Sequence, residues 1–490
     1  MSPKRVIFIE PSANKTNVFD SYMRLPLMGS LYLGTILHEH GYDVRILNEN
    51  IMGREIDAFE IPADVFCLTA LTGSASRTKY LAAYLKRIYP AARVIVGGIH
   101  ASLLPEEFTD VADHVVVGEA EEIIVDLVEG RFDEKIVQGR KVADMARLPL
   151  VRYDLLDGYR KLDLIPLMTS RGCPFNCNFC TVTKVFGREF RMLSPERVLT
   201  EIENALQYFS TRDFFFYDDN FTADRKRLAD LCDLLIARRV GITWAAQVRT
   251  DLARHPDLVE KMARAGCRWV YIGFESIENE TLKALRKSQT RADIEQAIAV
   301  FHQFGLNIHG MFMFGEDHDT LETFPQTVAF AIEHRIDTVQ FMILTPFPGT
   351  EYYERMLAED RLLHTDWDYY NAMFAVFQPK NMSALKLQAE TYRAYGKFYS
   401  LRRTALDALS LTVNVLLDAL VWNFGRAQRH NLATIFIRGG ANAIVLKGAR
   451  TSDSYLRFLG EAEQRKLLHA GGKNATTTPL PANIAPHRDA

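Results

Sequence analysis

The sequence has little of what marks several classes of protein. Its 58 lysines and arginines stand against 61 aspartates and glutamates, which leaves a formal net charge of only -3. A general nucleic-acid binder carries a basic excess to neutralise phosphates, so the sequence argues against DNA or RNA as a partner. The 490 residues include only six cysteines. This number suits a reducing cytosol better than a disulfide framework.

Long hydrophobic runs are absent as well. No window offers the roughly 20 uninterrupted apolar residues that a transmembrane helix needs. The first ten residues, MSPKRVIFIE, hold too short an apolar run for a signal peptide and predict a first strand instead. We therefore expect a cytoplasmic protein.

The first third of the chain alternates short Val/Ile-rich runs with amphipathic segments. The predicted strands are 6–9, 44–47, 65–71, 94–96 and 115–117, and the predicted helices are 29–40, 76–88 and 121–130. This alternation favours a parallel sheet covered on both faces, in a doubly wound domain of about five strands. Such folds bind ligands beyond the carboxyl ends of their strands, so the loops there are the place to look for a site.

Small and polar residues follow three of these strands. The stretches are Thr69-Ala70-Leu71, Gly97-Gly98-Ile99-His100 and Gly118-Glu119-Ala120-Glu121. Glycines at such positions let the backbone approach a bulky ligand closely. These residues alone leave open a cofactor domain, a nucleotide-type domain or a purely structural one, because a fold does not determine its ligand.

The middle of the chain repeats a strand-helix unit. Residues 142–163 are predicted to be a linker, and strands are then predicted at 164–169, 213–217, 242–247, 269–273, 308–314 and 338–344. Helical segments lie between them at 194–209, 225–238, 258–265, 279–284, 291–304 and 321–334. A repeated unit of this kind closes into a full or partial barrel whose active face lies at the carboxyl ends of the strands.

The C-terminal part is predicted to be helical from 376 to 470, with a disordered tail at 471–490. The aromatic stripe of Tyr392, Tyr395, Phe398 and Tyr399 favours core packing. Residues 405–424 are apolar but interrupted by acidic and amide side chains. We expect this segment to cap the barrel, with peripheral contact to the inner face of a membrane as the alternative.

One stretch, RGCPFNCNFC at 171–180, carries the most specific chemistry. It places Cys173, Cys177 and Cys180 with three and then two residues between them. A tetrahedral zinc site needs a fourth ligand nearby, yet the next cysteine is Cys232 and the nearest downstream histidine is His255. An iron-sulfur cluster tolerates three protein ligands if a substrate completes the fourth iron. Three structural cysteines in a loop are the alternative.

The cysteine spacing and its flanks resemble the signature of the radical S-adenosylmethionine (SAM) enzymes. With the preceding α/β domain, residues 1 to about 400 resemble the cobalamin-binding members of that family. The resemblance implies a 4Fe-4S cluster on the three cysteines, an open iron that binds SAM, and one-electron cleavage of SAM to a 5'-deoxyadenosyl radical. It also implies an α/β fold class: a doubly wound cobalamin-binding domain at 1–141, then a partial barrel of six units at 164–375.

The resemblance also implies cobalamin contacts in the N-terminal domain. The implied residues are Thr69, Leu71, Gly97, Gly98, Gly118 and Glu119. Some cobalamin domains carry an Asp-x-His-x-x-Gly motif whose histidine ligates cobalt, but the matching stretch at 24–29 has Pro26 in place of that histidine. Proline cannot ligate a metal. We therefore expect cobalamin to bind without a histidine ligand.

In the barrel, the resemblance implies a set of SAM contacts at the strand ends. Asp218 or Asp219 would face the methionyl amino group, Arg249 the carboxylate, and Glu275 with Ser276 the ribose, while Phe179 and the strand at 311–314 would border adenine. Ordinary roles are the alternatives for each. They are a divalent ion or a helix cap at the aspartates, a surface ion pair between Arg249 and Asp251, the start of a helix at Glu275-Ser276, and core packing for Phe312 and Met313.

The function implied by the resemblance is methylation of an unactivated carbon in a hydrophobic small molecule, through a 5'-deoxyadenosyl radical and methylcobalamin. An external one-electron donor such as flavodoxin or ferredoxin is also implied. Radical cyclisation or carbon-carbon bond formation without net methylation is the alternative within the family. A non-catalytic cobalamin or iron-sulfur redox sensor is the alternative from another class.

Overall fold

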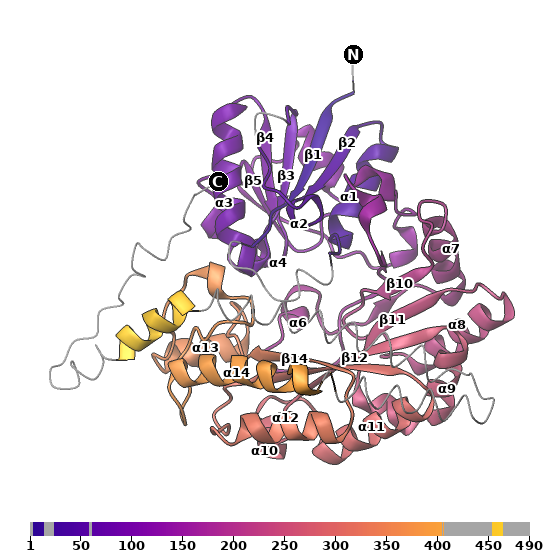
Figure 1. Ribbon diagram of the computed structural model, residues 1–490. Coiled ribbons are helices and arrows are strands. Elements are labelled where there is room, and N and C mark those ends of the chain that lie inside the picture. The colour runs from indigo at the N-terminus through magenta and orange to yellow at the C-terminus, as the bar shows by residue number, and fades with distance from the viewer. Residues whose placement is uncertain (1–2, 14–23, 58–60, 404, 406–452, 464–490) are drawn as a thin grey trace.

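The computed structural model describes residues 3–13, 24–57, 61–403, 405 and 453–463 (Figure 1). Its first body contains a six-stranded parallel sheet in the order β2-β1-β3-β4-β5-β6. The strands are β1 (Arg5–Glu10), β2 (Asp43–Asn48), β3 (Val65–Thr69), β4 (Arg93–Gly97), β5 (His114–Val117) and β6 (Ile136–Gln138). The sixth strand, β6, was not predicted, because three residues are too few for a periodic pattern.

Four successive side chains of β1, from Val6 to Ile9, are buried, so both faces of this strand are covered. The accompanying helices are α1 (Met28–Glu39), α2 (Glu49–Met52), α3 (Ala75–Ile88), α4 (Ile99–Leu103) and α5 (Ile124–Glu129). The strand order changes direction between β1 and β3, which places a crevice at the carboxyl ends of these two strands.

The second body holds another six-stranded parallel sheet, in the order β14-β13-β12-β11-β10-β7. Its strands are β7 (Ile165–Leu167), β10 (Asp213–Phe216), β11 (Thr243–Val248), β12 (Cys267–Glu275), β13 (Asn307–Phe314) and β14 (Thr338–Ile343). Its helices are α7 (Pro195–Ala205), α8 (Arg225–Ala237), α9 (Pro256–Arg264), α10 (Asn279–Ala284), α11 (Arg291–Gln303) and α12 (Thr323–Glu333). β7 and β14 lie at opposite ends of the order, so this is a partial barrel. The predicted α/β fold class is confirmed.

The predicted linker at 142–163 packs into the core. It forms three short 3-10 helices, Met145–Arg147, Tyr153–Leu155 and Tyr159–Lys161. Tyr153 is fully buried and donates a hydrogen bond from its hydroxyl to the carbonyl oxygen of Pro166 at 2.8 Å. Leu156 forms an isolated bridge with Ile46 of β2. The segment therefore contacts both bodies.

A two-stranded antiparallel ribbon brackets the cysteine loop. Its strands are β8 (Ser170–Arg171) and β9 (Arg191–Met192), and the loop between them contains α6 (Val182–Val185). In Figure 1, α6 lies between the two bodies, and α6 contacts α4 of the first sheet. The ribbon thus holds the loop at the boundary between the two sheets.

A buried charge cluster, here called the clamp, joins this ribbon to the first body. Arg171 forms ion pairs with Glu119 at 3.0 Å and with Glu121 at 2.5 Å. Arg191 forms an ion pair with Glu119 and donates a hydrogen bond to the carbonyl oxygen of Val142. Glu119, which follows β5, is 8% exposed and the two arginines are 4% exposed. Because each buried charge has a partner of opposite sign, the clamp fixes the base of the cysteine loop against the N-terminal domain.

The C-terminal segment contributes α13 (Glu351–Ala358) and α14 (Ala384–Phe398). The predicted core packing of the aromatic stripe is confirmed for Tyr395, Phe398 and Tyr399, which are buried. The Tyr399 hydroxyl accepts a hydrogen bond from the Val339 amide and donates one to its carbonyl oxygen, on the end strand β14. Within the described ranges, no helix is long and apolar enough to cross a membrane. The predicted cap beyond residue 405 and the predicted tail at 471–490 lie outside the described residues.

Candidate functional site

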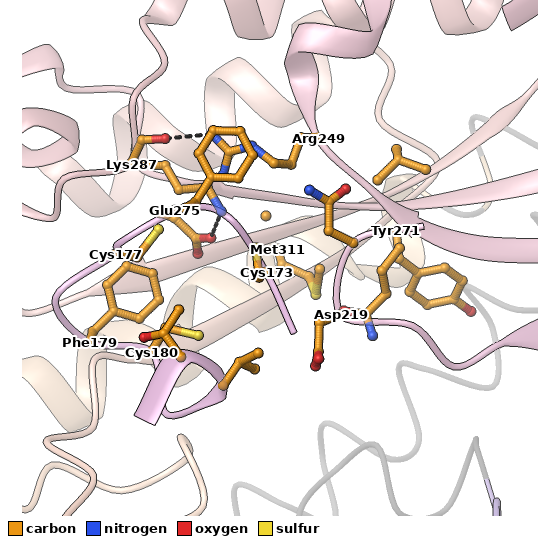
Figure 2. A pocket seen from close by; sticks show the side chains of 17 residues that line it. Cys173, Cys177, Phe179, Cys180, Asp219, Arg249, Tyr271, Glu275, Lys287 and Met311 are labelled. Carbon is orange, nitrogen blue, oxygen red and sulfur yellow. Dashed lines mark hydrogen bonds and ion pairs between the residues drawn. The ribbon is translucent and has the colours of Figure 1, made fainter. Parts of the chain in front are cut away.

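A cavity of about 200 Å³ lies where the cysteine loop meets the carboxyl ends of the barrel strands. Figure 2 shows the cysteine side chains, Arg249, Glu275 and Asp219 around it. The cysteine loop supplies one wall, with Cys173, Cys177 and Cys180 beside Phe175 and Phe179. The strand ends of β10, β11, β12 and β13 supply the opposite wall. The sequence prediction of a site at this end of the barrel is consistent with this placement.

The three cysteines carry free thiols. Burial raises the pKa of the Cys177 thiol and raises that of Cys180 to about 12, so a positively charged metal centre is needed to hold them as thiolates. Within the described residues, no three Cys, His, Asp or Glu side chains converge on one metal ion. A cluster does not require such convergence, because its thiolate ligands attach to different irons. The donor set therefore fits an iron-sulfur cluster better than a single zinc ion.

The carboxylate of Glu275 is turned into the cavity by an irregular backbone. Glu275 has a φ of +63°, and the pairing of β12 with β13 shifts register between Gly273 and Glu275. A register shift of this kind re-aims a side chain, and a left-handed non-glycine residue stores strain of the kind found at functional sites. Gly273 leaves room for this arrangement, because a Cβ at that position would displace the Glu275 carboxylate and the Lys287 amine.

Lys287 completes this arrangement from the connection between α10 and α11. Its amine forms an ion pair with Glu275 at 2.6 Å and is almost fully buried. The flanking residues Arg286 and Ser288 have φ values of +53° and +55°, which turn the chain tightly on either side. Gln289 donates to the carbonyl oxygen of Phe274 at 2.8 Å and so fastens the connection to β12. Lys287 is thus a fixed buried cation beside the cysteine loop.

Arg249 provides the second buried cation of the cavity. Its guanidinium lies 3.6 Å from the ring centroid of Phe175 and donates a hydrogen bond to the carbonyl oxygen of Lys287 at 2.7 Å. Among the described residues, its buried Nε has no hydrogen-bond acceptor. The alternative ion pair with Asp251 is long, at 3.7 Å, because Asp251 is paired with Arg225. The guanidinium therefore retains a donor for an anionic group such as the SAM carboxylate.

The structure separates the two aspartates of the predicted pair. Asp218 is fully buried, and its carboxylate accepts hydrogen bonds from the amide and hydroxyl of Thr169 and from the hydroxyl of Ser170 at 2.5 to 2.7 Å. Asp219 lines the cavity. The prediction is therefore revised: Asp218 supports the strand that leads into the cysteine loop, and Asp219 is the candidate for the SAM amino group.

Ser276 does not line this cavity, and its predicted contact with the ribose stays a prediction. Its hydroxyl accepts a hydrogen bond from the Glu278 amide at 3.0 Å. This is a local turn just before α10, whose N-cap residue is Glu278, so the Ser276 hydroxyl is engaged with the local backbone. Phe179 and Met311 line the cavity, and their contact with adenine stays a prediction, whereas Phe312 is fully buried in the core.

Several lining residues were not assigned a role from the sequence. They are Phe175, Asn220, Gln247, Tyr271 and Lys287. Asn220 and Gln247 stand at strand ends, where position alone is a usable signal. Lys287 follows a helix rather than a strand, and its role depends on a contact with Glu275 that no sequence pattern indicates.

A second cavity, of about 320 Å³, lies between the two bodies. From the first body it is lined by the turn at 71–74 and by Ile99, and from the second by Thr181, Phe347 and Tyr370. Leu71, one of the predicted cobalamin contacts, is 37% exposed and faces this cavity. We call this space the interdomain cavity.

The glycines predicted to approach cobalamin occupy tight or open backbone positions. Gly98 has a φ of +101°, and a Cβ there would come within 2.8 Å of the Ala70 carbonyl oxygen and of Thr69 Cγ2. Gly118 also has a positive φ, +86°, with open space around it. Gly97 would tolerate a Cβ, whose nearest neighbour would be Val116 at 3.9 Å. Gly98 therefore has the strictest need for glycine, because it lets this turn pack against the end of β3.

Glu119 does not serve the cofactor groove with its side chain. Its carboxylate accepts hydrogen bonds from Arg171, Arg191 and the Val142 amide, all within the clamp. The prediction of a cobalamin contact is revised for this reason: two buried guanidinium groups need its charge. Pro26, at the position of the motif's histidine, is buried, and the next amide, that of Leu27, donates to the carboxylate of Glu10.

The fold and the two cavities define an α/β protein with two adjoining cofactor sites. One is the cluster cavity in the partial barrel, and the other is the interdomain cavity beside the doubly wound sheet. Residues 167–331 match the radical SAM superfamily, and residues 15–128 match the B12 binding domain. The bacteriochlorophyllide d C-8(2)-methyltransferase of Chlorobaculum tepidum is 30% identical over 367 residues, which cover 71% of this chain and 80% of that protein.

Two further comparisons agree. The anaerobic magnesium-protoporphyrin IX monomethyl ester cyclase of Cereibacter sphaeroides is 27% identical over 69% of this chain and 60% of the cyclase. The solved structure of the cobalamin-dependent radical SAM enzyme OxsB, with aqua-cobalamin and SAM bound, matches with a TM-score of 0.64. The match covers 97% of this chain and 82% of the OxsB chain. The two sequences are 15% identical, so this match shows a shared fold. The chain belongs to the B12-binding radical SAM enzymes, whose cofactors are a 4Fe-4S cluster, SAM and cobalamin.

Asp219 gives a pH-dependent prediction. Burial, together with the charge of neighbouring Asp218, raises the pKa of Asp219 from 3.8 to about 7. Only the ionised carboxylate attracts the positively charged amino group of SAM, so SAM affinity should rise by up to about tenfold as the pH rises from 6 to 8. The same shift makes the ligand-free folded state bind more protons than the unfolded chain between about pH 4 and pH 7, so its stability should fall as the pH rises through that window.

Equilibrium SAM binding to the anaerobically reconstituted protein measures this effect. The Asp219→Asn variant should bind SAM weakly with no rise across the same pH range. A wild-type affinity that is flat with pH would remove Asp219 from the SAM site.

Proposed function

We propose that this protein is a cobalamin-dependent methyltransferase that acts on an unactivated carbon of a hydrophobic small molecule. The observation that carries the proposal is the adjacency of the two cavities. Thr181 lines the interdomain cavity, and its chain neighbours Cys180 and Val182 line the cluster cavity. A methyl donor in one cavity and a SAM molecule in the other are therefore separated by one segment of chain, as a substrate that reacts with both requires.

When bound, the cluster and cobalamin supply one-electron cleavage of SAM and a transferable methyl group. The protein's own residues bind and orient the reactants. Arg249 and Lys287 offer cationic groups to the SAM carboxylate, and Asp219 offers an acceptor to its amino group. Leu71 and Phe347 offer apolar surface to a hydrophobic substrate in the interdomain cavity.

The methyltransferase relative supports methylation, and the apolar lining of the interdomain cavity supports a hydrophobic substrate. Similarity to the cyclase favours a second candidate, radical cyclisation without net methylation. Both candidates use the same cluster cavity, so the products of the reaction must distinguish them.

The test is anaerobic reconstitution with iron, sulfide and hydroxocobalamin, followed by turnover with SAM and a reduced flavodoxin or ferredoxin as the proposed electron donor. Substrates come from lipid and pigment extracts of a strain that lacks the gene. Methyl transfer should give S-adenosylhomocysteine, 5'-deoxyadenosine and a product heavier by one methylene unit. Deoxyadenosine without S-adenosylhomocysteine would favour cyclisation, and the absence of both would favour a non-catalytic carrier.

A further inference from the structure

A buried histidine connects the interdomain cavity to a carboxylate behind it. His100, at the N-terminal end of α4, is fully buried. Its Nδ1 lies 3.3 Å from the hydroxyl of Thr72, and its Nε2 lies 3.4 Å from a carboxylate oxygen of Glu107. Thr72 lines the interdomain cavity, whereas His100 and Glu107 do not. The three side chains form a row that ends at the cavity wall.

The carboxylate sets the direction of the hydrogen bonds in this row. Burial alone would raise the pKa of Glu107, but hydrogen bonds from His100 and Trp367 outweigh that effect and lower it below its ordinary value. An ionised carboxylate only accepts, so Nε2 of His100 donates to Glu107. In the neutral imidazole, Nδ1 is then an acceptor, and the hydroxyl of Thr72 donates a hydrogen bond to it. The lone pairs of the Thr72 oxygen remain for a donor in the cavity.

A residue of the second body, Trp367, contacts the Glu107 end of this row. Trp367, in the 3-10 helix η9 (Trp367–Tyr369), donates from Nε1 to both carboxylate oxygens of Glu107 at 3.0 Å. Its ring lies 5.1 Å from the His100 ring, edge to face. The η9 helix also packs against η3 (Thr72–Ser74), the turn that carries Thr72. The row therefore spans the boundary between the two bodies.

We propose that His100 is a positioning residue that orients the Thr72 hydroxyl as an acceptor for an amide N–H of cobalamin in the interdomain cavity, with Trp367 securing the row from the barrel side. Cobalamin carries acetamide and propionamide groups around its corrin ring, and these are N–H donors. A cavity wall that presents a fixed acceptor matches them. The proposal depends on cobalamin binding at this boundary, and its test separates the two ideas.

The test is a double-mutant cycle of hydroxocobalamin affinity. The affinity of each anaerobic variant is measured by absorbance titration. Thr72→Val removes the acceptor and should weaken binding about 3- to 10-fold, while Thr72→Ser should bind like wild type. His100→Gln should weaken binding by a similar factor when Thr72 is present and by none in the Thr72→Val background. Trp367→Phe keeps an aromatic ring at this position but loses the N–H that donates to Glu107. It should weaken binding less than His100→Gln does.

If the role of His100 is purely structural, the fold losses of affinity from His100→Gln and Thr72→Val should multiply in the double variant. That result, or unchanged binding in Thr72→Val, would overturn the proposal. Thr391→Val is the matched control: its buried hydroxyl donates to the carbonyl oxygen of Leu387 in α14, and neither residue lines the interdomain cavity, so affinity should not change. If a variant fails to fold, the Thr72→Ser and Trp367→Phe pair still decides, because only the latter should weaken binding. Wild-type protein that binds no cobalamin would overturn the site assignment as well.

Discussion

Cys173→Ala is expected to abolish both the iron-sulfur cluster and the reductive cleavage of SAM. Cys173, Cys177 and Cys180 are the only cysteines that line the cluster cavity of the described structure. Two remaining thiolates cannot hold a cluster that also leaves one iron open for SAM. The measurements are the iron and sulfide content, the visible absorption of the reconstituted protein, and 5'-deoxyadenosine formed under reducing conditions.

The matched control is Cys232→Ala. Cys232 is fully buried in α8, away from the cavity, so its loss should leave cluster content and SAM cleavage unchanged. Cobalamin binding by Cys173→Ala should also persist, because Cys173 does not line the interdomain cavity. SAM cleavage that survives in Cys173→Ala would show that the ligand assignment is wrong.

Glu119→Gln is expected to destabilise the protein by about 3–5 kcal/mol and to lower its cluster content. The substitution keeps the volume of the side chain but removes the charge shared by Arg171 and Arg191. Arg171 retains Glu121, whereas Arg191 loses its only carboxylate partner in the clamp. An uncompensated buried guanidinium is costly, and both arginines stand at the base of the cysteine loop.

Thermal unfolding monitored by circular dichroism, together with iron content, measures this effect. Glu189→Gln serves as the control, because Glu189 lies in the same loop and is ion-paired with Lys141 at the exposed surface. Such a surface pair contributes little, so this variant should match wild type in both measurements. Equal behaviour of the two variants would mean that the clamp does not hold the loop.

The cluster ligands were predictable from the sequence because they depend on local spacing. Three thiols within eight residues lie on one loop whatever the rest of the chain does, and the missing fourth ligand is equally visible in the sequence. The alternation of strands and helices was predictable for a similar reason, since burial on both faces leaves continuous apolar runs such as Val6 to Ile9. The missing β6 was too short to leave such a run.

The roles of single polar residues were less predictable, because each depends on a partner far away in the chain. Asp218 and Asp219 are adjacent in sequence, yet one is held by Thr169 and Ser170 and the other lines the cavity. Glu119 follows a strand of the cofactor domain, as a cofactor contact would, but its partner Arg191 lies 72 residues away. No local pattern distinguishes these outcomes.

The sequence by itself determined the metal chemistry, the two-body α/β architecture and the presence of Pro26 where a cobalt-ligating histidine could stand. Each of these depends on residues that are close together in the sequence. Only the tertiary structure decided which carboxylates face a ligand. A register shift and a left-handed backbone turn Glu275 toward Lys287, and packing of the two bodies turns Glu119 toward the arginines of the ribbon. The physical reason is that a buried charge needs an opposite charge beside it, and only the folded chain brings that charge within reach.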